Sequence, residues 1–331
     1  MATDNVLEIK NLHTYFYTDG GVIKAVDGVD VELRRGATLG IVGESGSGKS
    51  VTSLSVMGLL TGTKGKIADG EILLDGDDIV KLTKEQQRKL RGSKISMIFQ
   101  EPMTSLNPVF TIGNQLDEVS FTHNPECTKE DARARSIEML TKVGIAMPDH
   151  VYASYPHELS GGMRQRVMIA MALIGKPKLI IADEPTTALD VTIQAQILEL
   201  LKTLQKEEGC SVMLITHDLG VIAEMADEVV VMYAGRVIEK GTAEEIFHNP
   251  MHPYTIGLQK SKPLITSSST EPLYSIPGQV PNPINLPDCC YFRNRCEKCI
   301  DKCNGEYPPE IKVSDTHFVS CYLYDKKGNE E

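Results

Sequence analysis

The chain has 331 residues, enough for one large or two modest domains with a buried core. Its 45 acidic residues outnumber its 34 basic ones and give a net charge of −11, so it lacks the overall basic character of nucleic-acid-binding proteins. No apolar run approaches the ~18 residues of a membrane span, and the first ten residues lack a signal-peptide pattern, which predicts a chain that stays in the cytoplasm.

The first sixty residues predict strands followed by a strand–loop–helix unit. Val6 to Val31 is predicted to form short alternating strands with a turn at Asp19-Gly20-Gly21. Thr38 to Val42 is a continuous apolar strand, and Ser50 to Leu60 has helical spacing. The loop between them reads Gly43-Glu44-Ser45-Gly46-Ser47-Gly48-Lys49-Ser50. Strand, glycine loop and helix in this order are the context that a phosphate-binding loop requires.

The chemistry of such a loop follows from its residues. Glycine permits a close approach, so successive backbone N–H groups can surround phosphates. The helix that begins near Lys49 points its positive end at the same anion. We expect Lys49 to bridge the β- and γ-phosphates of a nucleotide, and the Ser50 hydroxyl to bind Mg²⁺.

The middle of the chain predicts a helical insertion within an α/β core. Ile95 to Phe99 is a strand that Gln100 closes, and the sixty or so residues from there to Ser160 contain no predicted strand. Helices are predicted at Thr128 to Val143, Met163 to Gly175 and Thr192 to Glu207, and short apolar strands at Leu179 to Ala182, Val212 to Ile215 and Val229 to Met232. Strands that alternate with helices indicate a mostly parallel sheet covered on both faces.

Two adjacent carboxylates, Asp183 and Glu184, end one of these apolar strands, and Pro185 follows at once. Two carboxylates at such a position can have separate roles, because one can bind a metal while the other activates water. The run Leu159-Ser160-Gly161-Gly162-Met163 lies between the phosphate loop and this acid pair. With these three motifs in this order, the chain resembles the ATP-binding cassette (ABC) ATPases.

The resemblance implies a role for each matching residue. Asp183 would bind Mg²⁺, Glu184 would polarise the attacking water, and Gln100 would sense both the metal and that water. His217, which follows the strand Val212 to Ile215 and Thr216, would contact the γ-phosphate. Phe16 would stack on adenine, a role for which Tyr15 and Tyr17 are the alternatives. The other residues implied to bind ATP are those of the loop: Gly43, Glu44, Ser45, Gly46, Ser47, Gly48, Lys49, Ser50 and Val51.

In this family Ser160, Gly161 and Gly162 contact the nucleotide of the opposite cassette in a head-to-tail dimer, and the loop with Asp190 crosses to the partner. One chain carries one phosphate loop, one signature and one acid pair. We therefore expect a second cassette, either identical or homologous. Transport is favoured over two other classes: chromosome-maintenance ATPases carry long coiled-coil insertions, and translation factors carry two cassettes in one chain.

The C-terminal part changes character. Prolines punctuate it, a serine/threonine patch lies at Thr266 to Thr270, and the boundary falls near Asn249 to Pro263. Asn249 to Thr255 resembles the start of the extension in oligopeptide/dipeptide importer ATPases, within which His252 and Tyr254 are assigned no catalytic role. The resemblance implies a second ABC ATPase, two transmembrane permease subunits, an extracytoplasmic peptide-binding protein and a peripheral place on the cytoplasmic face of the membrane. Importers of nickel and other small solutes share this architecture.

Six of the eight cysteines crowd this C-terminal part, whereas Cys127 and Cys210 are isolated. The family pattern selects Cys290, Cys296, Cys303 and Cys321, and leaves Cys289 and Cys299 over. Four thiolates could hold a [4Fe–4S] cluster, which we favour, or a structural Zn²⁺, which the Cys296-x-x-Cys299 spacing also invites. Disulfides are disfavoured in the cytoplasm. In either case we expect a structural role, because the module has few large apolar residues.

The expected organisation is thus an α/β P-loop ATPase of the ABC type with a mixed or parallel core sheet and an N-terminal antiparallel part. The nucleotide-binding core is predicted at residues 1–100 and 160–248, the helical signature subdomain at 101–159, and the cysteine-rich extension at 249–331.

Overall fold

The computed structural model of the protein describes residues 4–60, 62–187, 189–261 and 274–325. These residues form two compact units, each built from separate segments of the chain. The first comprises Met1–Leu7, Leu33–Thr38 and Leu73–Ile215, and the second comprises Glu8–Glu32, Leu39–Ile72 and Thr216–Glu331. The serine/threonine patch at Thr266 to Thr270 lies outside the described residues.

The first unit contains three parallel strands, β6 (Ile95–Ile98), β7 (Leu179–Asp183) and β8 (Ser211–Ile215). Every residue of β7 and β8 is buried, which explains why both strands are continuous apolar runs in the sequence. Because the strands run in the same direction, β6 and β7 end at the same edge of the sheet. Gln100 follows the first of them, and Asp183 and Glu184 lie at the end of the second.

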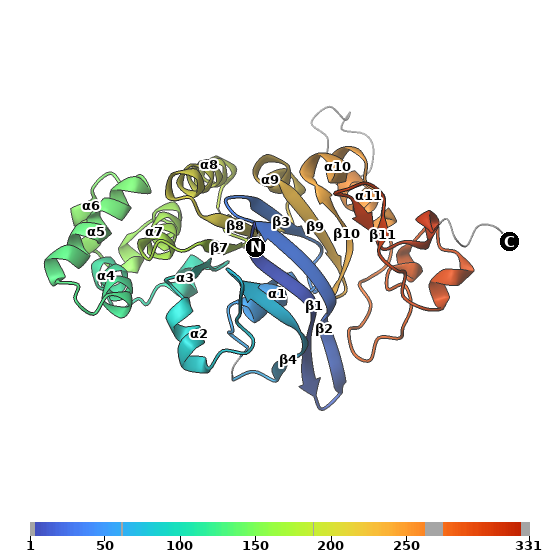
Figure 1. The fold of residues 1–331 in the computed structure, drawn as a ribbon. Helices are drawn as coiled ribbons and strands as arrows, with labels where there is room; N and C mark the ends of the chain where they lie inside the picture. Colours follow the sequence, from blue (N-terminus) through green and yellow to red (C-terminus); the bar gives the residue numbers. More distant parts are fainter. Residues whose placement is uncertain (1–3, 61, 188, 262–273, 326–331) are drawn as a thin grey trace. The chain divides into compact units, whose positions relative to one another are not determined.

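Helices make up most of the rest of this unit (Figure 1). The described part between Gln100 and Ser160 contains no strand, as predicted. Thr128 accepts a hydrogen bond from the backbone N–H of Asp131 and caps helix α5 as half of a capping box. The elements are β5 (Asp77–Asp78), α2 (Lys84–Leu90), α3 (Pro102–Ser105), α4 (Ile112–His123), α5 (Lys129–Lys142), α6 (Pro148–Ala153), the 3₁₀ turn η1 (Pro156–Glu158), α7 (Gly161–Ile174) and α8 (Val191–Glu208).

Two strands longer than predicted lead into the second unit. β1 (Asn5–Thr18) and β2 (Gly21–Arg34) each have 14 residues, so the prediction of short strands between Val6 and Val31 is wrong. Asn11 in β1 and Gly28 in β2 both have positive φ values, 46° and 75°. These local irregularities break the alternation of apolar residues without ending the strands. Together with β4 (Gly65–Leu74), they are hydrogen-bonded in the order β2, β1, β4.

The second unit also holds the strand that precedes the phosphate loop. β3 (Thr38–Val42) runs parallel to β9 (Glu228–Tyr233), with Val42 opposite Val231, and β9 is antiparallel to β10 (Arg236–Thr242). α10 packs against β9 and β10. The helices are α1 (Lys49–Val56), α9 (Leu219–Met225), α10 (Ala243–His248) and α11 (Pro253–Lys260).

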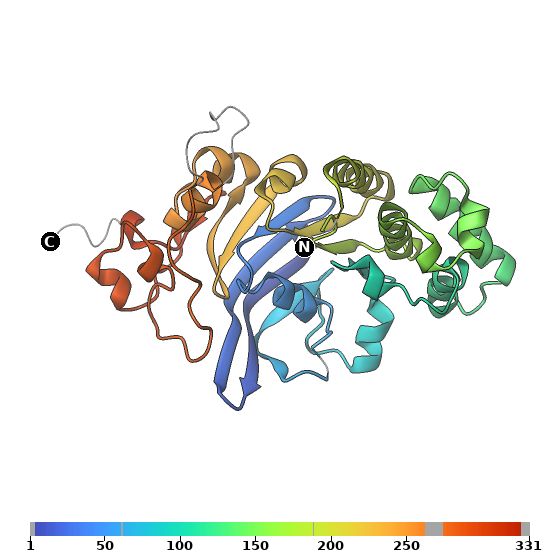
Figure 2. The same ribbon diagram turned by 180° about the vertical axis from the view of Figure 1, so that it is seen from behind.

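The C-terminal part consists mainly of turns and short elements (Figure 2). It returns to the sheet through β12, in which Val319 pairs antiparallel with Glu239 of β10. Two-residue strands leave no periodic signal, so the sequence did not predict this return. The elements are the 3₁₀ turns η2 (Arg293–Arg295), η3 (Asp301–Asn304) and η4 (Tyr322–Tyr324), and the strands β11 (Ile311–Lys312) and β12 (Phe318–Val319).

Candidate functional site

The glycine loop lies between β3 and α1, in the context that the sequence predicts. Gly43 and Gly48 adopt φ values of 156° and 100°. A Cβ at Gly43 would collide with the carbonyl oxygen of Met232, and one at Gly48 with that of Ala25. Only glycine fits these two positions, because both backbone conformation and space exclude a side chain. The loop is therefore closely packed against its own unit and presents N–H groups at the start of a helix.

Lys49 is buried, and its ammonium group lies over the loop. Lys49 Nζ donates hydrogen bonds to the carbonyl oxygens of Gly43 at 2.6 Å and Glu44 at 3.0 Å, and to Ser47 Oγ at 3.3 Å. A positive charge fixed beside backbone N–H groups and a helix N-terminus forms a site for a polyphosphate anion. Ser50, in the first turn of α1, is exposed and can offer its hydroxyl to a cation.

His217 belongs to the same unit as the loop. The backbone N–H of Thr216 donates to the carbonyl oxygen of Ile41 at 3.3 Å, so the residue before His217 lies beside β3, the strand that enters the loop. Asp218 then caps α9 by accepting a hydrogen bond from the N–H of Gly220 at 2.8 Å. The structure thus places His217 at the carboxyl end of β8, near the end of the strand that leads to the phosphate loop.

The first unit brings the predicted acids and the glutamine together. Gln100 Nε2 donates to Glu184 Oε2 at 2.9 Å, and Thr187 Oγ1 donates to the same oxygen at 2.9 Å. Asp183 is buried at the end of β7. Glu184 has a φ of 47°, a conformation that is costly for a residue with a side chain, and its N–H donates to the Ile215 carbonyl at 2.8 Å. A carboxylate held in this way is directed and restrained, as a group that orients water must be.

The signature residues form the beginning of helix α7, whose N-terminal end is exposed although most of the helix is buried. Ser160 is the N-cap of α7 and accepts a hydrogen bond from the N–H of Met163 at 3.3 Å. Asp190 caps α8 in the same way, accepting from Ile193 at 3.0 Å. Gly162 lies against Ile193, since a Cβ there would be 3.0 Å from Ile193 Cγ2. Two helix N-termini with exposed caps are therefore held side by side, which suits a surface that contacts an anion on another molecule.

The three N-terminal aromatic side chains differ in their surroundings. The Tyr15 hydroxyl donates to Asp27 at 2.6 Å, within a partly buried hydrogen-bond network. The ring of Phe16 lies against the backbone of Gly65, where a Cβ would be 2.7 Å from Phe16 Cε1. Tyr17 is exposed. Stacking on adenine by Phe16 stays a prediction, whereas the ring of Tyr15 is engaged elsewhere.

Sequence reasoning missed two residues that contact the loop from the C-terminal part. The Glu44 N–H donates to the Tyr254 hydroxyl at 2.8 Å, and Arg295 donates to both carboxylate oxygens of Glu44 at 2.6 and 3.0 Å. Tyr254 lies in the Asn249 to Thr255 motif, and Arg295 precedes Cys296. Nothing in the spacing of these residues links them to the loop, so the sequence contained no signal for the contact.

The cysteines of the C-terminal part are free thiols. Burial raises the pKa of Cys290 to about 12, and the neighbouring Cys303, Cys321 and Cys296 add to that rise. Cys290 also donates its backbone N–H to the carbonyl of Cys303 at 3.1 Å. The four predicted ligands are therefore neighbours. Among the described residues, however, no three Cys, His, Asp or Glu side chains are arranged to hold a metal ion.

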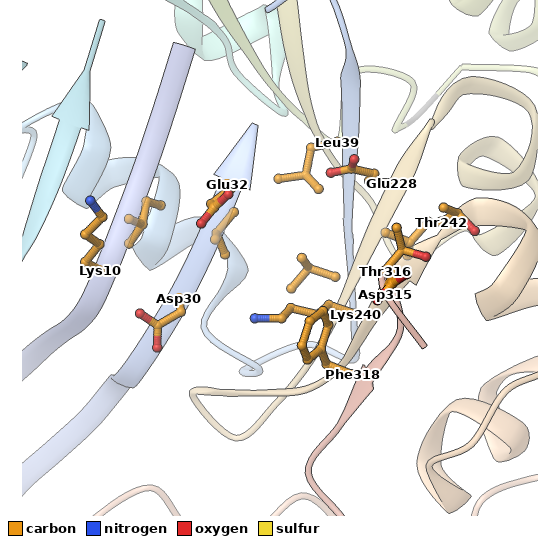
Figure 3. Close-up of a pocket in the computed structure, with 15 residues that line it drawn as sticks. Lys10, Asp30, Glu32, Leu39, Glu228, Lys240, Thr242, Asp315, Thr316 and Phe318 are labelled. Atoms are coloured by element: carbon orange, nitrogen blue, oxygen red, sulfur yellow. The ribbon is translucent and has the colours of Figure 1, made fainter. Parts of the chain in front are cut away.

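A pocket elsewhere in the second unit contains none of the predicted nucleotide-binding residues (Figure 3). Lys10, Asp30 and Glu32 come from β1 and β2, and Lys240 and Phe318 from β10 and β12. Acids and lysines are mixed along its wall, so it offers no single charge to a ligand. No helix among the described residues is long and apolar enough to cross a membrane.

The chain is similar to known proteins over nearly its whole length. A family model described as ABC transporter matches residues 26–187, and one described as oligopeptide/dipeptide transporter, C-terminal region, matches residues 238–303. The oligopeptide transport ATP-binding protein AppD of Bacillus subtilis (strain 168) is 52% identical over 98% of this chain and 99% of its own length. The dipeptide transport ATP-binding protein DppD of the same organism is 50% identical over 98% of this chain and 96% of its own.

The fold is also similar to solved structures. The dimeric, post-hydrolysis ATP-binding cassette MJ0796 bound to ADP and Pi matches with a TM-score of 0.64 and 30% identity, over 72% of this chain and 98% of that chain. CbiO1 from Clostridium perfringens, part of the ABC transporter complex cbiONQ, has the same TM-score of 0.64 and covers 78% of this chain and 96% of its own. These matches confirm the predicted fold class. The chain belongs to the ABC ATP-binding proteins of the oligopeptide/dipeptide importer family.

Proposed function

We propose that this protein hydrolyses ATP to energise the import of dipeptides or oligopeptides through a membrane ABC transporter. The observation that carries the ATPase part is the hydrogen bond from Gln100 to Glu184, which holds a carboxylate in a strained backbone position next to the buried Asp183. The peptide part rests on the similarity to AppD and DppD, which extends through the C-terminal region.

The residues that we assign to hydrolysis form two groups, which are described separately for the two units. Lys49 and the N–H groups of residues 43 to 51 bind the phosphates of ATP, and His217 acts at the γ-phosphate. Mg²⁺ prefers oxygen ligands, and Ser50, Gln100 and Asp183 are the residues that would offer it hydroxyl, amide and carboxylate oxygens. When bound, Mg²⁺ would supply positive charge that offsets the charge of the phosphates. Glu184 orients and polarises the attacking water, because its carboxylate is fixed by Gln100 and Thr187.

The proposed active form contains two cassettes. Ser160, Gly161 and Gly162 would contact the ATP bound by the partner cassette, since Ser160 and Gly161 are exposed at the N-terminus of α7, where the first N–H groups have no partner within the helix. Asp190, at the exposed cap of the neighbouring helix α8, would accompany them across the interface. The partner is a second ABC ATPase, either a copy of this chain or a homologue.

The other partners follow from the importer architecture. We propose two transmembrane permease subunits, an extracytoplasmic peptide-binding protein and a peripheral position on the cytoplasmic face of the membrane. No nucleic-acid partner is proposed, since the chain has a net charge of −11. A nickel or other small-solute importer is the second candidate. A non-transport ABC ATPase is the third, disfavoured by the short span from Gln100 to Ser160.

The function is tested by uptake in the source organism with the gene replaced by a Lys49→Ala variant. Uptake of labelled dipeptides and oligopeptides should fall to background, whereas uptake of labelled nickel should be unchanged. Loss of nickel uptake with intact peptide uptake would support the second candidate instead. Normal uptake of both would contradict the transport proposal. ATPase assays of the purified wild-type and variant chains test the catalytic part separately.

We further propose that Cys290, Cys296, Cys303 and Cys321 hold a [4Fe–4S] cluster, with a structural Zn²⁺ as the alternative. Four thiols suit either group, and the mutual influence of the four on the pKa of Cys290 supports their proximity. Their present arrangement does not form a ready metal site, so binding would require the side chains to rearrange. No step of hydrolysis is assigned to the group.

The proposal is tested on protein purified without oxygen, by its visible absorption spectrum and by iron, sulfide and zinc analysis. A brown protein with about four irons, bleached by dithionite, would support the cluster. A colourless protein with one zinc would support the alternative. A protein that contains neither metal would contradict both the cluster and the zinc alternative, and would leave the proposed ATPase activity unaffected.

A further inference from the structure

One residue of the phosphate loop, Glu44, is bound on two sides by the C-terminal part of the chain. Its backbone N–H donates to the Tyr254 hydroxyl at 2.8 Å, and its carboxylate accepts two hydrogen bonds from Arg295, at 2.6 and 3.0 Å. All three residues lie in the second unit. The backbone and the side chain of Glu44 are thus both fixed from outside the loop.

Arg295 is built into this position. Only 7% of the residue is exposed, and it lies in the 3₁₀ turn η2, directly before Cys296. Its Nε donates to the carbonyl oxygen of Pro277 at 2.9 Å, and its Nη1 lies 3.4 Å from the Tyr233 hydroxyl. A two-pronged contact of this kind fixes both the distance and the plane of the carboxylate. The guanidinium therefore cannot move away from Glu44 without losing its other partners.

Tyr254 is also held firmly. Its ring is fully buried, with its centroid 4.8 Å from that of Tyr233 and 5.5 Å from that of Phe292. The preceding His252 accepts the N–H of Tyr254 on Nδ1 at 3.0 Å. Burial raises the pKa of Tyr254, so its hydroxyl stays neutral and accepts the Glu44 N–H throughout the working range. The position of this hydroxyl is set by packing around the start of α11.

We propose that Arg295 and Tyr254 are positioning residues for ATP binding: they hold the phosphate loop through Glu44 and neutralise the negative charge that Glu44 places in it. The proposal rests on the function proposed above, because it assigns ATP to this loop. It makes the C-terminal part, with its cysteines, a determinant of nucleotide affinity.

The negative charge of Glu44 sets the direction of the expected effect. Glu44 O accepts a hydrogen bond from Lys49 Nζ at 3.0 Å, so this residue lies next to the group that attracts the phosphates. An unpaired carboxylate here would repel the anionic phosphates of ATP and compete for the Lys49 ammonium. Pairing with Arg295 cancels that charge, and because 30% of the Glu44 side chain is exposed, salt should partly screen the repulsion that remains when Arg295 is replaced.

The test measures the Kd of purified protein for a fluorescent ATP analogue, mant-ATP, with Mg²⁺, alongside the thermal unfolding midpoint. Arg295→Met keeps an unbranched apolar stem in place of the arginine stem and removes the guanidinium and its charge. We expect its Kd to rise about tenfold at low salt, and the difference to shrink as salt is added. Tyr254→Phe removes one oxygen and keeps the ring packing, and should raise the Kd by a smaller factor.

Lys302→Gln is the matched control, because it removes a positive charge from the same part of the chain. Lys302 pairs with Asp325 at 2.7 Å and does not touch the loop. The Kd of the Lys302→Gln variant for mant-ATP should equal that of the wild type. The double variant Glu44→Gln with Arg295→Met should recover most of the lost affinity, since the repelling charge is then absent. In ATPase assays, KM for ATP should rise in Arg295→Met while kcat changes little.

The outcomes separate the two proposals. If the wild type does not bind mant-ATP, the proposed function fails. If the wild type binds and both Arg295→Met and Tyr254→Phe bind equally well at low salt, the positioning role is overturned. Lower unfolding midpoints with unchanged Kd in both variants would show a purely structural role, and would also overturn the proposal.

Discussion

Gln100 Nε2 lies 2.9 Å from Glu184 Oε2, and the two residues are 84 positions apart in the sequence. Their meeting is a consequence of the parallel pairing of β6 and β7, in which Ile98 is opposite Ala182. Both strands end at one edge of the sheet, so the residues that follow them are brought together. A change in either residue should therefore alter the chemistry of the other.

Glu184→Gln is expected to abolish hydrolysis while ATP binding is retained. Glutamine has the same shape and can still contact Gln100 and Thr187, but it cannot polarise water as a carboxylate does. We expect kcat to fall by about 10²- to 10⁴-fold, the range for loss of a general base. Phosphate release and mant-ATP binding measure the two properties separately. Turnover at the wild-type rate would refute the assignment of Glu184 as the base.

Gln100→Glu should shift the pH dependence of hydrolysis. The substitution places a second carboxylate within hydrogen-bond distance of Glu184, and like charges raise the pKa of one member of such a pair. Because the base must be ionised to act, the acidic limb of the kcat profile should move to higher pH, by about one unit or more. Gln100→Leu is the control: it should lower kcat without this upward shift, and an equal shift in both variants would count against the explanation.

Substitutions of Ser160 can separate helix capping from contact with the partner's ATP. Asp and Asn are N-cap residues as good as Ser, so α7 should remain intact in both variants. The negative charge of Ser160→Asp would face the phosphates, so this variant should lower the ATPase activity of the assembled transporter at least about 100-fold. Ser160→Asn adds no charge and should lower the activity less. Mant-ATP affinity of the isolated chain and its unfolding midpoint should be unchanged in both. Equal activity of Ser160→Asp and wild type would contradict the assignment.

Most of the core fold was predictable because its strands are continuous apolar runs. Every residue of β3, β7 and β8 is buried, and each matches a predicted strand to within one residue. β1 and β2 are longer than the strands that the sequence predicts. Asn11 and Gly28 adopt positive φ values and interrupt the alternation of apolar residues, but they do not end the strands. β11 and β12 are too short to show any period, and their pairing depends on β10, more than seventy residues earlier in the chain.

The candidate site divides in the same way. The loop residues, Gln100, Asp183, Glu184 and Ser160 were found because each follows a strand or begins a helix in a recognisable order. Arg295 and Tyr254 were not assigned to the site, because only the folded structure shows that their partner is Glu44. For the cysteines, the sequence predicts more than the structure shows. Their spacing suggests a metal site, whereas among the described residues their side chains are not arranged to hold a metal ion.

His252 should make the protein less stable in mild acid. The residue is 2% exposed and caps α11, and burial lowers its pKa to about 3. In the unfolded chain a histidine has a pKa of about 6.5. Between these values the unfolded state binds more protons than the folded state, so stability falls as pH drops below about 6.5. This residue alone should cost about 2 kcal/mol at about pH 5.

The measurement is urea unfolding of wild type and His252→Asn between about pH 7.5 and pH 5, the window in which this histidine should matter. Asparagine is a good N-cap, so it can still accept the N–H of Tyr254, and it does not titrate. The buried Glu239 carboxylate accepts the His252 N–H at 2.9 Å in both proteins, because that bond comes from the backbone. The wild type should lose about 2 kcal/mol more than the variant over this range. Parallel curves would show that His252 is not kept neutral by burial.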